Sequence, residues 1–483
     1  MNFKFLIKAL AILATVISAF MSIPAAIALY SGETKPAFAF ISVILTTVFI
    51  SSIILLSGKN WQISRISTRE SFMMVFLSWG LASFLGSLPF YISGEIPSFV
   101  DAFFETTSGF TTTGATILTS IENLPSSLLF WRSLTHWLGG MGIIVLTIAI
   151  LPVLGIGGLQ LLKAEAPGPT VDKITPRVAQ TAKALWFIYM GMTAAQVILL
   201  RFAGMNYFDA FTHTFGTLAT GGFSPKSASA GHYNSAQIDG IITFFMILAG
   251  INFTIHYRLL TGKTKSILKN TEIKVYLSIL AVATLFLTAN LYKGVYETIP
   301  EAFRYGSFQA ASIMTTTGYG TADFAKWPVF SQAILFTLMF FGACSGSTGG
   351  GMKIIRLVTL FKIGINEMKY LLHPKAVFPL RIDGKIIKKD MGYSVAAFFF
   401  LYIFMLLLTA LVCASSGVDI LTSFATALAT VGNIGPGFGR IGPSHDYAFY
   451  ADHVKGFLSF AMIVGRLEVY TVLVIFTRSF WRK

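Results

Sequence analysis

Short runs of threonine and glycine recur four times in this 483-residue chain, at residues 111–115, 219–223, 315–320 and 430–434. Their central glycines are Gly114, Gly221, Gly318 and Gly432. Rings of backbone carbonyl oxygens can replace the water around a dehydrated cation, and threonine hydroxyls add further oxygen ligands. Glycine tolerates the backbone angles that turn carbonyls inward. One such run is also common where membrane helices touch, but four copies favour the selectivity filter of a cation pore.

An acidic residue precedes each run: Asp101, Asp209, Glu301 and Asp419. It lies about thirteen positions before the central glycine in repeats one, two and four, and about one helical turn further away in repeat three. We predict that each acid begins a half-helix, where it opposes the positive end of the helix dipole. The return loop of a half-helix is stable at membrane depth only when it is buried in protein or lines water. Four such units predict a pore with fourfold pseudo-symmetry.

The composition indicates a membrane protein, because 54% of the residues are hydrophobic and 12% are charged, against about 25% charged in a soluble chain. A spanning helix needs about 20 mostly apolar residues. The candidates are residues 5–30, 37–56, 72–92, 128–156, 185–203, 238–258, 275–291, 329–355, 392–412 and 456–475. We therefore predict an all-α polytopic membrane protein with about ten transmembrane helices and four re-entrant pore half-helices in a pseudo-fourfold arrangement.

The order of these elements divides the chain into five parts. We predict an extra N-terminal helix pair at residues 1–70, then pore repeats at 71–163, 164–262, 263–390 and 391–483. The first two helices have no Thr/Gly run between them, so we interpret them as lipid-facing packing outside the repeats. The four repeats share one direction through the membrane, since each starts from a basic loop.

The formal net charge of +15 gathers in particular loops. Lys and Arg crowd residues 59–69, 163–183, 258–274 and 353–389 and the C-terminal tail, whereas the intervening loops carry Asp and Glu. Basic loops mark the cytoplasmic side of a membrane. We therefore predict that both termini are cytoplasmic, and we interpret the charge as setting topology rather than binding nucleic acid.

The third run contains Thr317, Gly318, Tyr319 and Gly320, which is close to the filter motif of potassium channels. With the four runs, the half-helix plan and the extra N-terminal pair, the chain resembles the Trk/Ktr/HKT potassium transporter superfamily, closest to the TrkH-type potassium uptake subunit. The resemblance covers nearly the whole chain. It implies that the four central glycines are the key filter glycines. It also implies that the protein lies in the inner (plasma) membrane of a bacterium. Relatives that favour Na⁺ carry serine at the first of these positions, so Gly114 implies a preference for K⁺.

The predicted filter residues are Thr112, Thr113, Gly114, Ala219, Thr220, Gly221, Thr316, Thr317, Gly318, Tyr319, Thr430, Val431, Gly432 and Asn433. The predicted K⁺ contacts are Thr113, Thr220, Thr317 and Val431. Ala115, Gly222 and Asn433 stand where the third run has Tyr319. Fewer aromatic supports imply a shorter filter with fewer ion sites.

A glycine-rich stretch at residues 342–351 interrupts an apolar segment of repeat three. Each glycine costs about 1 kcal/mol in a helix interior relative to alanine, so we predict a loop inside the membrane. The resemblance implies that this loop is a gate and places an arginine below the filter. The predicted gate residues are Gly346, Ser347, Thr348, Gly349, Gly350, Gly351 and Arg466. The alternatives are a flexible connection or tight helix packing for the loop, and an ion pair with Glu468 or another acid for Arg466.

Two other basic or histidine positions have a simpler interpretation. We predict that Lys353 and Arg356 extend to the cytoplasmic face, with a gating role as the alternative. We interpret His136 as a packed histidine rather than a proton carrier.

A second hypothesis for the chain is a secondary carrier that couples a cation to H⁺ or Na⁺. Carriers often have inverted repeats around broken helices, whereas parallel repeats favour a pore. We find no nucleophile with a base, no metal-ligand spacing and no phosphate-binding Gly-Lys-Ser/Thr motif, so we predict no enzyme. We predict no covalent cofactor, with K⁺ as the transported ion. The resemblance further implies a homodimer in lipid with a cytoplasmic nucleotide-binding regulatory subunit of the TrkA type.

Overall fold

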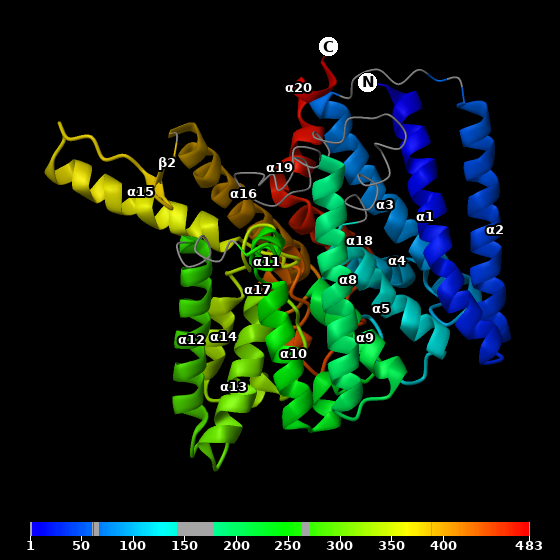
Figure 1. Cartoon of the computed structure of the whole chain (residues 1–483), viewed down its shortest axis with the longest axis horizontal. Helices are drawn as coiled ribbons and strands as arrows, with labels where there is room; N and C mark the ends of the chain where they lie inside the picture. Colours follow the sequence, from blue (N-terminus) through cyan, green and yellow to red (C-terminus); the bar gives the residue numbers. More distant parts are fainter. Residues whose placement is uncertain are drawn as a thin grey trace.

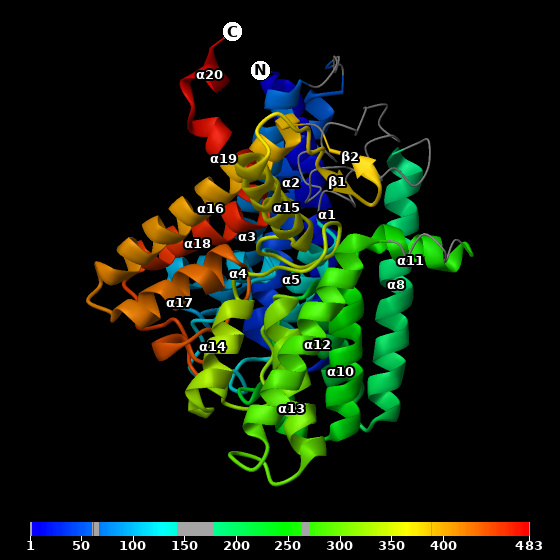
Figure 2. The same ribbon diagram turned by 90° about the vertical axis from the view of Figure 1, so that its left-hand side faces the viewer.

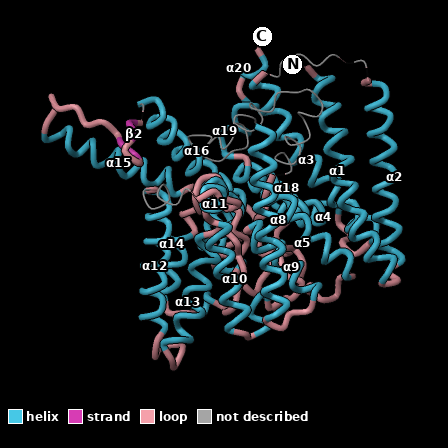
Figure 3. The backbone as a smooth tube through the Cα atoms, in the orientation of Figure 1, coloured by secondary structure: helices cyan, strands magenta, loops and turns pink. Residues whose placement is uncertain are grey.

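The protein is almost entirely helical in the computed structural model, which describes residues 2–59, 61, 67–142, 178–262, 270–387 and 389–482 (Figure 1, Figure 3). The only strands in these ranges are β1 (Arg381–Ile382) and β2 (Lys385–Ile386), which pair antiparallel as a small hairpin. The predicted all-α fold class is therefore confirmed.

One order of elements occurs four times: a long helix, a short helix, an extended segment and a second helix. The first set is α3 (Thr68–Ser93), α4 (Phe99–Phe110) and α5 (Ser126–Gly140). The second set is α8 (Val178–Phe202), α9 (Tyr207–Ala219), α10 (Ala236–Ala249) and α11 (Phe253–Leu260). The third set is α12 (Thr271–Leu291), α13 (Ile299–Met314), α14 (Val329–Leu338) and α15 (Ile354–Leu372). The fourth set is α16 (Lys389–Ala414), α17 (Ile420–Val431), α18 (Asp452–Arg466) and α19 (Glu468–Leu473).

Two helices precede these four sets, and short 3₁₀ turns occur within the last three sets or after them. The preceding pair is α1 (Phe3–Tyr30) and α2 (Thr34–Ser57), which pack against each other at one side of the molecule (Figure 1). α1 also contacts α3 and α5. The short turns are η2 (Ser229–Tyr233), η4 (Phe324–Lys326), η5 (Gly439–Ile441) and η6 (Val474–Phe476), and the last helix is α20 (Arg478–Trp481).

Six helices in the described ranges are long and apolar enough to cross a membrane: α1, α2, α3, α8, α12 and α16. The pairs α10–α11 and α18–α19 would raise this to eight, although they bend by 98° and 112° at their breaks. These bent pairs correspond to the predicted spans 238–258 and 456–475, and two further predicted spans are interrupted, because α5 ends at Gly140 and α14 ends at Leu338. The rest of the predicted span 128–156, from residue 143 on, lies outside the described residues.

Each short helix begins at a polar cap whose side chain accepts a hydrogen bond from the backbone three residues on. The caps are Ser98, Asn206, Thr298 and Asp419. The four helices have 12, 13, 16 and 12 residues. The extra turn predicted for repeat three is therefore present.

Successive repeats pack through the second helix of one and the half-helix of the next. α5 packs on α9, α10 packs on α13, and α18 of the last repeat returns to α4 of the first. Between the third and fourth repeats, the Phe438 ring packs edge-on against Phe324 and Phe336, with centroids 5.2 and 5.8 Å apart. The repeats thus close around a common centre. Figure 2 shows the molecule from the side of α12 to α15.

Candidate ion-conduction site

The four Thr/Gly runs adopt one backbone conformation, defined by two residues of positive φ separated by a third. These pairs are Thr112 and Gly114, Thr220 and Gly222, Thr316 and Gly318, and Asn433 and Gly435. The middle residue of each run donates its backbone N–H to the carbonyl five residues earlier, over 2.8 to 2.9 Å. These four middle residues are Thr113, Gly221, Thr317 and Ile434. We call the three residues of each run its inner, middle and outer position.

This register differs from the predicted one in repeats two and four. The glycines equivalent to Gly114 and Gly318 are Gly222 and Gly435, whereas Gly221 takes the middle position. The predicted filter residues Ala219, Thr430 and Val431 lie in the last turn of α9 or α17, and Gly432 ends α17 with φ of −79°. Val431 therefore does not occupy the position of Thr113 and Thr317, which belongs to Ile434.

The acidic residues explain the difference in repeat four. Asp101, Asp209 and Glu301 are the third residues of their half-helices, whereas Asp419 is itself the cap. Counting from the acid therefore moves the equivalent glycine three positions, from Gly432 to Gly435. In repeat two the difference is one residue, because two glycines stand side by side.

The four outer glycines and the four middle carbonyls form a closed ring. A methyl group built on Gly435 would lie 2.6 Å from the carbonyl oxygen of Thr113, where real side chains keep at least 3.0 Å. Methyl groups on the other outer glycines would meet the middle carbonyl oxygen of the next repeat. The pairs run Gly114 to Gly221, Gly222 to Thr317, Gly318 to Ile434, and Gly435 back to Thr113. Main chain thus contacts main chain around the whole circle.

A cavity of about 110 Å³ opens on one side of this ring, and all four outer glycines line it. Polar side chains around its mouth include Lys226, Ser229 and Asp446. A second cavity of about 160 Å³ is lined by the predicted gate residues 346–351 and Arg466, and no ring residue is part of its lining. The ring and the second cavity thus share no lining residue.

The threonine hydroxyls do not all face the centre of the ring. Thr113 and Thr317 each bond their hydroxyl to the threonine two residues earlier, over 2.8 and 2.7 Å. Asn433 also donates its side-chain amide to the Thr113 hydroxyl over 2.9 Å, which joins the last repeat to the first. The buried hydroxyl of Thr112, by contrast, has no hydrogen-bond partner in the described part of the chain. In repeat one, the inner residue Thr112 therefore offers a hydroxyl that the middle residue Thr113 does not.

The glycine-rich loop between α14 and α15 lies directly against the inner end of the ring. The backbone N–H of Gly350 donates to the Thr316 hydroxyl over 2.7 Å. A methyl group on Gly350 would lie 2.5 Å from the carbonyl oxygen of Gly432 and 2.8 Å from the Cβ of Asn433. Gly349 is close to repeat three, because its methyl group would lie 3.1 Å from the carbonyl oxygen of Thr315. The loop thus occupies the space beneath two of the four runs.

Two cations, the partly buried Arg466 and the buried Lys353, hold carbonyl groups of this loop. Arg466 donates to the carbonyl oxygen of Thr348 over 2.7 Å, and also to those of Gly139 and Gly140 over 3.0 and 3.2 Å. Lys353 donates to the carbonyl oxygen of Gly349. The loop is therefore held by Arg466 at the end of α18 and by Lys353 at the start of α15.

Comparison with known proteins identifies the family. The family model described as "Cation transport protein" of the TrkH family matches residues 37–483. The chain belongs to this family. It is 39% identical over 492 residues to the Trk system potassium uptake protein TrkH of Salmonella typhimurium, and each covers 100% of the other. The Trk system potassium uptake protein TrkG of Escherichia coli is 38% identical over 450 residues, covering 91% of this chain and 92% of its own.

The three-dimensional comparison agrees with the sequence comparison. The crystal structure of the potassium transporter TrkH from Vibrio parahaemolyticus superposes with a TM-score of 0.88 at 37% identity, over 100% of both chains. The predicted resemblance to the TrkH type is therefore confirmed, and the chain is a multi-pass membrane protein. Membership of a transport family also agrees with the prediction that the chain is not an enzyme.

Aromatic side chains support the ring in two repeats of this TrkH-family protein. The Tyr319 hydroxyl donates to the carbonyl oxygens of His213 and Phe223, over 2.9 and 3.2 Å. Residues following the outer glycines are Ala115, Phe223, Tyr319 and Pro436. Repeat two therefore has an aromatic residue where the predicted alignment placed Gly222. Phe223 is fully buried and stacks on the packed His136 ring at 4.1 Å.

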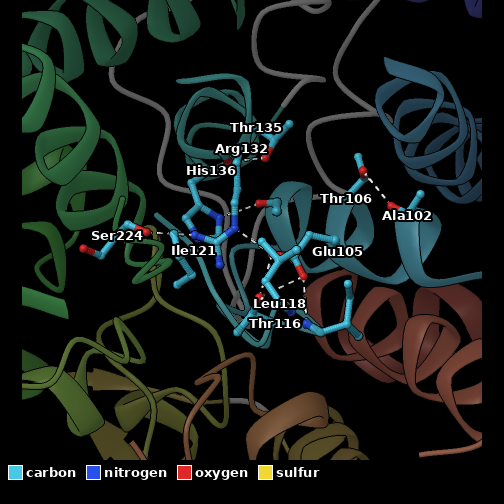
Figure 4. Close-up of polar contacts among 12 residues, drawn as sticks. Ala102, Glu105, Thr106, Thr116, Leu118, Ile121, Arg132, Thr135, His136 and Ser224 are labelled. Carbon is cyan, nitrogen blue, oxygen red and sulfur yellow. Dashed lines mark hydrogen bonds and ion pairs between the residues drawn. The ribbon is translucent and has the colours of Figure 1, made fainter. Parts of the chain in front are cut away.

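A buried ion pair within repeat one also bonds the segment that follows the ring in repeat two (Figure 4). Arg132 on α5 donates to Glu105 on α4 over 2.6 Å, and both side chains are at most 2% exposed. Glu105 also accepts from the Thr116 hydroxyl and the Ile117 backbone, over 2.9 Å each. Arg132 donates to the carbonyl oxygen of Ser224 over 3.0 Å. One ion pair thus fixes the segments that follow two neighbouring outer glycines.

Sequence reasoning missed several of these residues and misplaced others. Lys353 and Arg356 are buried rather than extended to the surface, with Arg356 paired to Glu468 and lying 3.8 Å from the Phe398 ring. The sequence holds one indication of the Glu105–Arg132 pair: a carboxylate within an apolar half-helix needs a buried partner.

Alanine at Gly435 tests the register. Positive φ strains a residue with a side chain by about 1–3 kcal/mol, and the methyl group would also overlap the Thr113 carbonyl. We expect Gly435→Ala to lower Rb⁺ flux into proteoliposomes about tenfold or more. Gly320→Ala is the matched control, since its methyl group would meet only Pro443 at 3.6 Å. Equal flux through both variants would contradict the register.

Glutamine at Glu105 tests the ion pair. The change leaves Arg132 buried without its counter-charge, and breaking a buried pair costs about 3–5 kcal/mol. We expect Glu105→Gln to lower the unfolding temperature in detergent and to raise Na⁺ flux relative to Rb⁺ flux. Asp323→Asn is the control, because its pair with Lys326 is exposed and such pairs contribute about 0–1 kcal/mol. An unchanged flux ratio in Glu105→Gln would limit the pair to a structural role.

Proposed function

We propose that this protein takes up potassium through a pore along the axis of the ring. The observation that carries the proposal is the closed circle of backbone contacts from Gly114 to Gly435. Carbonyl oxygens in such a circle can replace the water of a K⁺ ion. We assign K⁺ contacts to the carbonyls of Thr113, Gly221, Thr317 and Ile434, and to the Thr112 hydroxyl.

The charges around the ring support a cation rather than an anion. α4, α9, α13 and α17 all end immediately before the ring, so the negative ends of four helix dipoles approach it. The ring residues themselves are Thr, Gly, Asn and Ile, without a carboxylate. Selection would therefore depend on neutral oxygen atoms, which suits a monovalent ion that must also leave its site.

The names of the relatives support potassium as the transported ion. They are named as potassium uptake proteins of a Trk system, and the solved relative is named as a potassium transporter. We infer the same cargo for this chain because identity extends over the full length. A system also implies further subunits, so we propose a cytoplasmic nucleotide-binding partner of the TrkA type and a homodimer. The basic loops and both termini would then face the cytoplasm.

We further propose that the loop at residues 346–351 is the gate and that Arg466 belongs to it. The contacts of Gly350 with Thr316 and Asn433 support this, because an ion leaving the inner end of the ring would meet the loop. Arg466 and Lys353 add positive charge at the same place. A cation would then face both a steric and an electrostatic barrier.

Rubidium flux through the purified protein tests the function. We expect Rb⁺ to enter proteoliposomes down its own gradient, with no need for a pH or Na⁺ gradient. Uptake only with such a gradient would favour the coupled carrier.

We expect Gly114→Ser to raise Na⁺ flux relative to Rb⁺ flux, because serine adds a side chain where the Gly221 carbonyl lies. An unchanged ratio would count against the filter.

Removal of residues 345–348 tests the gate. We expect this deletion to raise basal Rb⁺ flux severalfold, since it shortens the loop beneath Thr316. Arg466→Ala should also raise basal Rb⁺ flux, because the substitution removes a positive charge and the bond to Thr348. Size-exclusion elution would verify folding of both variants. A folded deletion with wild-type flux would remove the loop from the gate.

A further inference from the structure

Glu272 is a buried acid that belongs neither to the ring nor to the loop, yet it bonds the protein on both sides of the loop. It lies in the first turn of α12 and is 6% exposed. Its Oε1 atom accepts the backbone N–H of Ser345 over 2.7 Å and that of Ile355 over 3.2 Å. Ser345 precedes residues 346–351, and Ile355 follows them in the first turn of α15. One carboxyl oxygen thus joins the two ends of the loop.

This bond has a clear physical preference. Ile355 lies where the backbone N–H groups of α15 have no partner within the helix, and a carboxyl group is favourable at such an end. Ser345 lies in the loop that follows α14 and is partly buried, where a backbone N–H without a hydrogen bond is costly. Glu272 satisfies both groups from a third element. The loop ends are therefore held together by α12 and not only by each other.

The start of α12 is itself attached to the β1–β2 hairpin. The backbone N–H of Thr271 donates to the Asp383 side chain over 2.8 Å. Asp383 and Gly384 form the turn of the hairpin, with φ of 50° and 77°. Thr271 and Glu272 are consecutive, so the hairpin turn and the loop ends contact neighbouring residues of one helix end. Asp383 is exposed, whereas Glu272 is buried.

The loop is also bonded to repeat two. The backbone N–H of Phe253, at the start of α11, donates to the carbonyl oxygen of Gly346 over 2.9 Å, and that of Thr348 donates to Ala249. The two ends of the loop further bond each other, Gly342 to Met352 and Ile354 to Ala343. Among the described contacts, Glu272 is the residue outside this segment whose side chain bonds both ends at once.

We propose that Glu272 is a positioning residue that keeps the loop against the ring, and that the β1–β2 hairpin sets its position through Asp383. The proposal rests on the gate described above and adds its regulation. Movement of the exposed hairpin shifts the first turn of α12, and the Glu272 carboxyl group transmits the shift to both ends of the loop. A cytoplasmic protein that displaces the hairpin would therefore open the gate without contacting the loop.

Flux measurements on three variants test this. We expect Glu272→Ala to raise basal Rb⁺ flux at least threefold, and Glu272→Gln to stay near wild type because its amide oxygen still accepts both bonds. Asp383→Ala should raise flux by a smaller factor. Glu70→Ala is the matched control, since Glu70 is also a buried acid in the first turn of a long helix, but it bonds Asn2 and Ser67 instead of the loop.

The deletion of residues 345–348 separates this idea from a general loss of packing. In the deletion background Glu272→Ala should have no further effect, because its loop partner is gone. An equal rise in both backgrounds would overturn the proposal. A deletion that raises flux while Glu272→Ala does not would overturn the role of Glu272 and leave the gate intact. A deletion with wild-type flux would instead refute the gate itself.

Hydrogen exchange gives a readout that does not depend on transport. We expect Glu272→Ala to speed amide exchange in residues 342–355, while residues 111–116 of the ring stay unchanged. Faster exchange in both segments would indicate general unfolding and would overturn the positioning role. If Glu272→Ala does not fold, Asp383→Ala keeps the test, because it leaves Glu272 in place. Wild-type exchange and flux in that variant would refute the coupling to the hairpin.

Discussion

The contact on which this structure depends joins an outer glycine of one repeat to a middle carbonyl of the next. Each of these contacts leaves no room for a methyl group, so the four segments can meet only as bare main chain. A polar backbone packed this way is unstable in lipid. The surrounding helices, the capped half-helices and the Glu105–Arg132 pair all serve to exclude lipid from the segments and to fix their distances.

Much of this arrangement could be predicted from the sequence, because it follows from local chemistry. Apolar length predicts the long helices, and an acid near a Thr/Gly run predicts each half-helix and its direction. The register could not be predicted, because two positions near a helix start suit an acid equally well. Asp419 takes the cap and Asp101 the third residue, and only the fold decides between them. The partners of Lys353 and Glu272 were equally hidden, since they lie far apart in the chain.

The breaks in the second helices have a common cause. Methyl groups on Gly139 and Gly465 would overlap the carbonyl oxygens of Phe110 and Val431, the last residues of two half-helices. The second helices must therefore carry glycine where they pass the inner end of the ring. Glycine weakens a helix, and α5 and α18 end at or next to these positions. The close packing at the inner end of the ring thus coincides with the ends of two second helices.

The two cations beneath the ring are attached to different parts of the protein. Arg466 on α18 bonds the loop at Thr348, but it also bonds Gly139 and Gly140 on α5. Lys353 precedes α15 and would move with the loop, because its partner Gly349 belongs to the loop. In the proposed gate, withdrawal of the loop would therefore displace one cation, while Arg466 stays bonded to α5. A fixed positive charge raises the energy of a passing cation at short range, so the proposed open pore would keep a barrier that the loop does not control.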